Sequence, residues 1–234
     1  MAHTLQSVIE KGGLPLAHRL RDPQIGSTKG APCLVLLHGV GANEVNLIDF
    51  AARQDPRLCV ILARGPITFG PGQFGWFNVN FTPTRPVIHT AQAEQSRQTL
   101  VDFIAGLPAA YGIDPHRIWI AGFSQGGILS ASVGLTRPDM VAGFGILSGR
   151  ILPEIAPLTA SSQELGKLHV FVSHGLHDGK LSIDFARSAQ RLLAEKDVKL
   201  TYREYVAAHE LNGDMQRDFG QWITQQLDAE PVGP

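Results

Sequence analysis

Residues 117–126 read Arg-Ile-Trp-Ile-Ala-Gly-Phe-Ser-Gln-Gly, and this short run carries the strongest indication of the fold. The apolar half is too short for a helix, whereas the residues that follow, 126–136, suit one. A serine in the pattern Gly-x-Ser-x-Gly sits on a sharp turn from strand to helix, at the carboxyl end of a parallel sheet. Glycines on both sides of it let the backbone reverse without side-chain collisions. The run therefore predicts Ser124 as an exposed nucleophile at a sheet edge.

The rest of the chain alternates short apolar runs with longer helix-compatible stretches. The predicted strands are 33–37, 58–63, 118–122, 141–147, 168–173 and 199–205. The predicted helices are 45–53, 91–107, 126–136, 183–196 and 211–227. Several of the strands are apolar throughout, as expected when helices cover both faces of a parallel sheet. The pattern predicts a three-layer α/β fold with a mostly parallel central sheet, preceded by an edge hairpin over 7–20.

Length and composition set limits on the class of protein. The 234 residues suit one domain spanning 1–234. The net charge of −1 shows no basic field, so we expect no nucleic-acid partner. No apolar stretch approaches the length of a membrane span, and the first residues lack the order of a secretory signal. We expect a cytoplasmic protein without stable membrane association.

The two cysteines, Cys33 and Cys59, each fall inside a predicted strand. We interpret both as small buried hydrophobic side chains. The alternative is a disulfide between the two cysteines, which requires their strands to be neighbours. Neither cysteine has the spacing of a metal ligand, so they predict no metal site.

A serine hydroxyl becomes a useful nucleophile only beside a base, which itself needs an orienting acid. His209 lies between the last predicted strand and the last predicted helix, where the base of such a fold belongs. Asp178 follows the preceding strand in a loop with a glycine on each side of it, and it is the best candidate for the acid. Asp184 and Asp197 fall at the ends of a predicted helix and suit that role less well.

The same loop raises the alternative of a metal site. His174, His177 and Asp178 lie close together in the sequence. The sequence offers no further cluster of ligands to complete a coordination shell, so no metal is predicted.

Attack on a carbonyl produces an oxyanion that needs preorganised backbone donors. We expect one donor to be the amide of Gln125, at the start of the helix after the serine. The second is expected in the glycine-containing loop 37–44, with Val40 as the donor. His38 precedes the serine in the chain, and we interpret it as a support of this loop rather than a base.

Two long connections, 65–90 and 149–166, contain many apolar side chains. The first carries Phe74, Trp76 and Phe77 among glycines and prolines. The apolar side chains of such loops can pack as small hydrophobic clusters beside the main core. If they overhang the carboxyl edge of the sheet, they would wall a substrate slot instead. On the second reading, Phe74, Trp76 and Phe77 contact the substrate.

With these residues assembled, the chain resembles the phospholipase/carboxylesterase family of α/β-hydrolases, which includes acyl-protein thioesterases. The matching segments span most of the chain and lie at 37–41, 76–77, 122–127, 174–178 and His209. The resemblance implies the α/β-hydrolase fold and Ser124, Asp178 and His209 as the catalytic triad. It also implies Val40 and Gln125 as the oxyanion hole, and hydrolysis of esters or thioesters without a cofactor.

The expected function is that of a serine carboxylesterase acting on small acyl esters with short to medium chains. Alternatives are an acyl thioesterase or lysophospholipase with the same triad, and a binding protein that has kept the scaffold. The family includes monomers and dimers, so a homodimer is an alternative to a monomer. The chain departs from the family pattern at Asn78, where aspartate is common, and at residues 179–180, where a valine-proline step is common.

Overall fold

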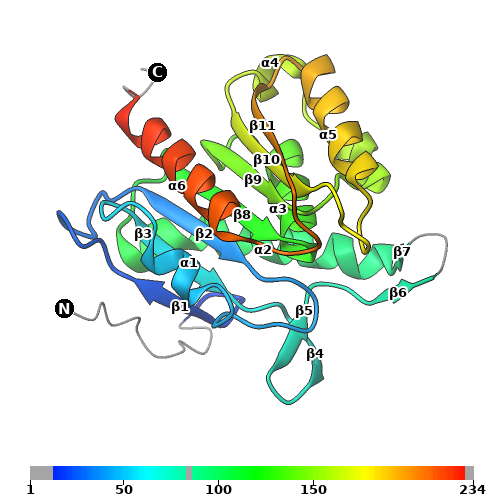
Figure 1. The fold of residues 1–234 in the computed structure, drawn as a ribbon. Helices are drawn as coiled ribbons and strands as arrows, with labels where there is room; N and C mark the ends of the chain where they lie inside the picture. The colour runs from blue at the N-terminus through cyan, green and yellow to red at the C-terminus, as the bar shows by residue number, and fades with distance from the viewer. Residues whose placement is uncertain (1–12, 83–85, 230–234) are drawn as a thin grey trace.

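A computed structural model of the chain describes residues 13–82 and 86–229. Its centre is a seven-stranded sheet with the spatial order β1-β3-β2-β8-β9-β10-β11 (Figure 1). The strands of this sheet are β1 (His18–Arg21), β2 (Cys33–Leu37), β3 (Cys59–Ala63), β8 (Ile118–Phe123), β9 (Gly143–Leu147), β10 (His169–Gly175) and β11 (Lys199–Tyr205). Only β1 runs antiparallel to its neighbour, and the other pairs are parallel. The predicted mostly parallel sheet is confirmed.

The helices cover both faces of the sheet, as the apolar strands predict. They are α1 (Ile48–Ala52), α2 (Thr90–Tyr111), α3 (Gln125–Thr136), the 3-10 helix η1 (Pro153–Leu158), α4 (Ser162–Leu165), α5 (Ile183–Glu195) and α6 (Gly213–Asp228). Side chains of α2, α3 and α5 form one core cluster with one face of the sheet. Side chains of α1 and α6 form a second cluster on the opposite face (Figure 1). The result is the three-layer arrangement of an α/β-hydrolase.

Most predicted boundaries lie within a few residues of the observed ones. The largest differences are at the helix predicted over 91–107, where α2 continues to Tyr111, and at 45–53, where α1 covers only Ile48–Ala52. The long connection 65–90 is not irregular, because it folds into two hairpins. These are β4 (Ile67–Gly70) with β5 (Gln73–Gly75), and β6 (Val79–Phe81) with β7 (Pro86–Ile88).

The first part of the predicted edge hairpin, residues 7–12, lies outside the described residues. The second part contains β1, which pairs with β3 in antiparallel register from His18 with Ala63 to Arg21 with Val60. No helix in the described ranges 13–82 and 86–229 is long and apolar enough to cross a membrane.

Cys33 and Cys59 are register partners on the neighbouring strands β2 and β3. Both are fully buried and both are free thiols. Burial is the main cause that raises the pKa of the Cys33 thiol well above its ordinary value. The interpretation of the two cysteines as buried core side chains is confirmed.

Candidate active site

The carboxyl ends of three strands lie at one edge of the sheet and bring three side chains that are distant in the sequence together. Ser124 follows β8, Asp178 follows β10, and His209 follows β11. The Ser124 hydroxyl lies 2.9 Å from Nε2 of His209, and Nδ1 of His209 lies 2.6 Å from Oδ2 of Asp178. Nδ1 of the imidazole therefore donates to the carboxylate, and Nε2 accepts from the hydroxyl. This tautomer leaves the imidazole ready to take the serine proton.

The backbone at Ser124 is held in an unusual conformation. Its φ of 55° and ψ of −114° place it in the left-handed half of conformational space, where residues other than glycine are uncommon. Gly122 and Gly126, on either side of Ser124, must be glycines because a side chain would have no room there. A Cβ on Gly126 would lie 2.2 Å from the Leu37 carbonyl oxygen, and one on Gly122 would lie 2.3 Å from the Gly126 backbone. The turn thus presses α3 against β2 and projects the hydroxyl from the sheet edge.

Asp178 is buried, and hydrogen bonds from several donors fix its orientation. Its Oδ1 accepts from the backbone amides of Lys180 at 2.9 Å and Leu181 at 2.8 Å. Its Oδ2 faces His209 and also lies 3.2 Å from Nε2 of His174. Burial alone would raise the pKa of Asp178, but the hydrogen bonds from His174, His209 and the two amides outweigh it and lower that pKa. The carboxylate is therefore ionised at neutral pH.

His174 is a part of the site that sequence reasoning assigned to no role. It is fully buried near the end of β10, and its Nε2 donates to the Leu181 carbonyl at 2.8 Å while facing Asp178. It fixes the loop that carries the aspartate. The signal in the sequence was its position, shortly before Asp178 at the end of a predicted strand. Among the described residues, no group of three or more His, Cys, Asp or Glu side chains is placed to hold a metal ion.

The two predicted oxyanion donors lie at the same edge as the serine. Val40 follows β2, Gln125 begins α3, and both residues line the cavity that contains Ser124. Within the part of the chain that the structure describes, neither backbone amide has a hydrogen-bond acceptor. Both are thus available to an oxygen atom bound beside the serine.

His38 supports the loop that carries Val40, as the sequence predicts. Its Nδ1 donates to the Gly39 carbonyl at 2.7 Å, and its Nε2 accepts from the Gly65 amide at 2.9 Å. Burial is the main cause that lowers the pKa of His38 to about 4. The ring is therefore neutral at neutral pH, as its acceptor role requires.

The side chain of Gln125 has a function beyond its backbone amide. Its Oε1 accepts from the Trp76 amide at 2.7 Å, and its Nε2 donates to the Phe77 carbonyl at 2.6 Å. Both bonds are buried, so the glutamine ties the loop 65–90 to the start of α3. Asn78, which differs from the aspartate common in the family, is the next residue in the chain. Its backbone amide and its side-chain amide both donate to Oε1 of Gln92 on α2.

The three aromatic side chains of that loop that are predicted to contact substrate divide into two groups by their position relative to the cavity at Ser124. Phe77 lines the cavity at Ser124. Trp76 does not line it, because its indole is fully buried and donates to the His38 carbonyl at 3.0 Å. Phe74 does not line it either, because the Arg64 guanidinium covers its ring at 4.8 Å from the centroid. Trp76 and Phe74 support the loops around the site.

The cavity at Ser124 is narrow, with a free volume of about 20 Å³. That is room for little more than one water molecule. Its apolar wall is made of side chains from the loop 65–90, α3 and the loop after Asp178, namely Phe77, Val79, Pro86, Ile88, Ile128 and Leu181. The remaining described lining residues include the cations Arg150 and Lys180. The structure thus presents a tight apolar slot with positive charge at its border.

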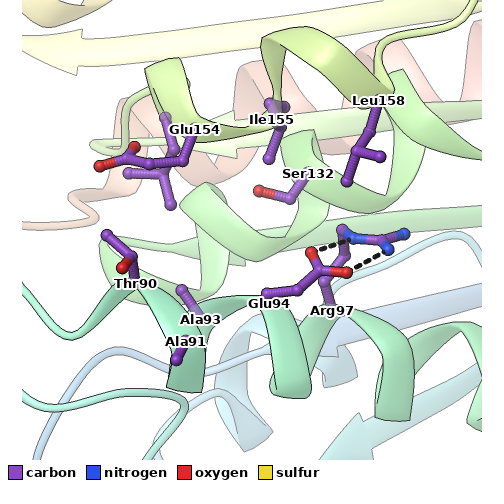
Figure 2. A pocket seen from close by; sticks show the side chains of 10 residues that line it. Thr90, Ala91, Ala93, Glu94, Arg97, Ser132, Glu154, Ile155 and Leu158 are labelled. Carbon is purple, nitrogen blue, oxygen red and sulfur yellow. Dashed lines mark hydrogen bonds and ion pairs between the residues drawn. The ribbon is translucent and has the colours of Figure 1, made fainter.

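A larger cavity of about 320 Å³ lies between α2, α3 and η1 (Figure 2). Figure 2 shows the Glu94–Arg97 ion pair on its floor, with Ile155 and Leu158 above Ser132. None of Ser124, Asp178 and His209 lines it, and it shares no lining residue with the narrow slot. Its lining holds the paired Glu94 and Arg97 and the carboxylate of Glu154 but no histidine or cysteine, so we place the chemistry at the slot despite its smaller volume.

The fold and this edge of the sheet define an α/β-hydrolase. The sequence signature of the family described as phospholipase/carboxylesterase matches residues 24–227, and the chain belongs to that family. An acyl-protein thioesterase 1 from Eremothecium gossypii is 30% identical over 215 residues, covering 86% of this chain and 90% of the relative. The carboxylesterase SOBER1 of Arabidopsis thaliana is 24% identical, covering 83% of this chain and 90% of the relative.

Solved structures show the same fold. A carboxylesterase from Mesorhizobium loti superposes with a TM-score of 0.80 at 23% identity, covering 93% of this chain and 98% of the other. The Bacillus cereus carboxylesterase gives a TM-score of 0.78 at 21% identity, covering 90% and 94%. Together with the family match, these relatives identify the chain as a hydrolase acting on esters.

Proposed function

We propose that the chain is a serine carboxylesterase in which Ser124 is the nucleophile, His209 the general base and Asp178 the orienting acid. The observation that carries this proposal is the continuous hydrogen-bonded series from Ser124 through His209 to Asp178, at 2.9 and 2.6 Å. Ser124 Oγ attacks the acyl carbonyl while Nε2 of His209 takes its proton. The amides of Val40 and Gln125 meet the negative charge that develops on the carbonyl oxygen.

The second half of the reaction uses the same groups. The imidazolium of His209 gives its proton to the leaving alcohol, so the carbon–oxygen bond of the ester breaks and Ser124 carries the acyl group. A water molecule then loses a proton to His209 and attacks the acyl-enzyme. The acid is released, and the proton returns to Ser124. Throughout the cycle the Asp178 carboxylate stabilises the imidazolium without accepting its proton.

The narrow slot favours the short end of the proposed acyl range. In a homologous series of p-nitrophenyl esters, we expect kcat/KM for the acetate and butyrate to exceed that for the decanoate by at least about tenfold. The reason is that a long chain finds only about 20 Å³ beside Ser124 and must displace packed side chains such as Phe77 and Ile128. Initial rates at substrate concentrations below KM give the ratio directly.

The control for this series is the variant Phe77→Ala, which removes one wall of the slot. It should reduce the ratio of kcat/KM for butyrate to kcat/KM for decanoate, because the longer ester gains more from the added space. Equal kcat/KM values across the wild-type series would contradict a slot that selects by chain length.

Thioester hydrolysis is the second candidate, favoured by the 30% identity to an acyl-protein thioesterase. The same serine, histidine and oxyanion donors serve both reactions, because the tetrahedral intermediate differs only in its leaving group. A matched pair of butyrate esters with oxygen and sulfur leaving groups separates the two candidates.

A further inference from the structure

His174 is a buried histidine beside the proposed triad that has no part in the proposed proton transfers. It lies near the end of β10 and is fully buried. Its Nδ1 has no hydrogen-bond partner among the described residues, whereas two acceptors face its Nε2. A proton on Nδ1 would be buried without an acceptor, so the ring places its proton on Nε2. His174 is therefore a hydrogen-bond donor through Nε2.

The two acceptors that face Nε2 both belong to the segment from Asp178 to Leu181. The Leu181 carbonyl oxygen lies at 2.8 Å and Oδ2 of Asp178 at 3.2 Å, so the one N–H is shared between them. The Leu181 amide in turn donates to Oδ1 of Asp178 at 2.8 Å. These three residues thus close a ring of polar contacts that reaches both carboxylate oxygens.

This ring of contacts bears on how Asp178 meets His209. Oδ2 of the carboxylate faces both Nε2 of His174, at 3.2 Å, and Nδ1 of His209, at 2.6 Å. A carboxylate with donors on both oxygens cannot turn about its Cβ–Cγ bond without losing some of these contacts. Burial acts to raise the pKa of Asp178, and the contact with His174 is the strongest of the causes that lower it. His174 thus acts on both the orientation and the charge of the carboxylate.

The charged neighbour of His174 on the next strand has partners of its own. Glu204 is the register partner of His174 on β11. Its exposed carboxylate accepts from Arg187 at 2.9 Å and from Tyr202 at 2.7 Å. The donor of His174 is directed to Leu181 and Asp178 instead.

We propose that His174 is a positioning residue for ester hydrolysis, which holds the Asp178 carboxylate in the orientation that His209 requires. This proposal rests on the proposed function, because it takes Asp178 and His209 as members of the triad. Without the donor, the carboxylate can turn away from the imidazole, so the proton transfers slow down. His174 does not line the cavity at Ser124, so its loss should lower kcat and leave KM nearly unchanged.

The variants His174→Phe and His174→Gln separate donation from space filling. Phenylalanine keeps a ring in the buried space but cannot donate, whereas the two N–H groups of a glutamine amide can serve both acceptors. With p-nitrophenyl butyrate, we expect kcat to fall about 10- to 100-fold in His174→Phe, with KM within about twofold of the wild-type value. In His174→Gln the restored donor should keep kcat within about threefold of wild type.

A second variant and a spectroscopic measurement keep the test independent of how well His174→Phe folds. His174→Asn also removes the donor, because its shorter amide does not reach the two acceptors, and it should be as slow as His174→Phe. The proton between Nδ1 of His209 and Asp178 gives a far-downfield NMR resonance. We expect that resonance to stay in place in His174→Gln and to move in the two variants without the donor.

His177→Phe is the matched control, because His177 is exposed, lies next to Asp178 and does not line the cavity. It should keep the wild-type kcat. Wild-type kcat in folded His174→Phe or His174→Asn would overturn the proposal, and so would a His174→Gln as slow as both. Hydrolysis by the wild-type protein would in that case still support the esterase function, whereas a folded wild type that hydrolyses no ester would contradict both.

Discussion

Replacing Ser124 with alanine is expected to lower kcat for p-nitrophenyl butyrate by about 10⁵-fold or more. The variant keeps the oxyanion donors and the slot but loses the atom that attacks the carbonyl. His209 then has no hydroxyl at its Nε2, so no acyl-enzyme can form. Only the small rate enhancement from binding and electrostatic stabilisation should remain. The measurement is the initial rate at saturating ester, corrected for spontaneous hydrolysis.

The matched control for this variant is Ser132→Ala, on the same helix α3. Ser132 is also buried, but its hydroxyl donates to the Ile128 carbonyl within the helix. Its loss should change kcat by less than about threefold, since it does not touch the reacting atoms. If Ser124→Ala kept most of its activity with an unchanged circular dichroism spectrum, the assigned nucleophile would be wrong.

Replacing Asp178 with asparagine should lower kcat by about 10³- to 10⁴-fold. Oδ1 of Asp178 accepts hydrogen bonds from the Lys180 and Leu181 amides, so an asparagine would keep its carbonyl oxygen there. Its amino group would then face His209 where the carboxylate oxygen was. An amino group donates, which forces the proton of His209 onto Nε2 and removes its ability to take the serine proton.

Asp197→Asn provides the control for this change of charge. Asp197 is exposed and has a φ of 56°, a conformation that asparagine also tolerates. It should retain full activity, whereas Asp178→Asn should be slow while remaining folded, as checked by urea denaturation. Near wild-type kcat in Asp178→Asn would show that His209 is oriented by another group.

Much of the fold could be predicted because parallel strands leave a strong local signal. The run 199–205 was predicted as a strand with its observed bounds, and the strands around Cys33 and Ile118 differ by at most a residue. The hairpins β4–β5 and β6–β7 were missed, since their short strands are half-exposed and lie between glycines and prolines. Strands of that kind form through tertiary contacts, such as the bonds from Gln125 to the Trp76–Phe77 segment.

The candidate site was predictable in its members but not in its details. Chain order and strand ends are sufficient to nominate Ser124, Asp178 and His209, because the carboxyl ends of parallel strands share one edge. The direction of a side chain is not encoded in that order. Hence Trp76 was expected to contact substrate, although it packs under the loop of His38. The role of His174 depends on a contact across a folded loop, which no spacing rule supplies.

We propose that the folded chain makes the hydroxyl of Ser124 reactive, and covalent labelling tests this reactivity most directly. A fluorophosphonate reacts with an activated serine and stays attached to its oxygen. We expect one equivalent of label on the wild-type protein, located by peptide mass analysis on the peptide that contains Ser124, and no label on Ser124→Ala. Label on another residue, or a wild-type protein that remains unlabelled while folded, would contradict the claim.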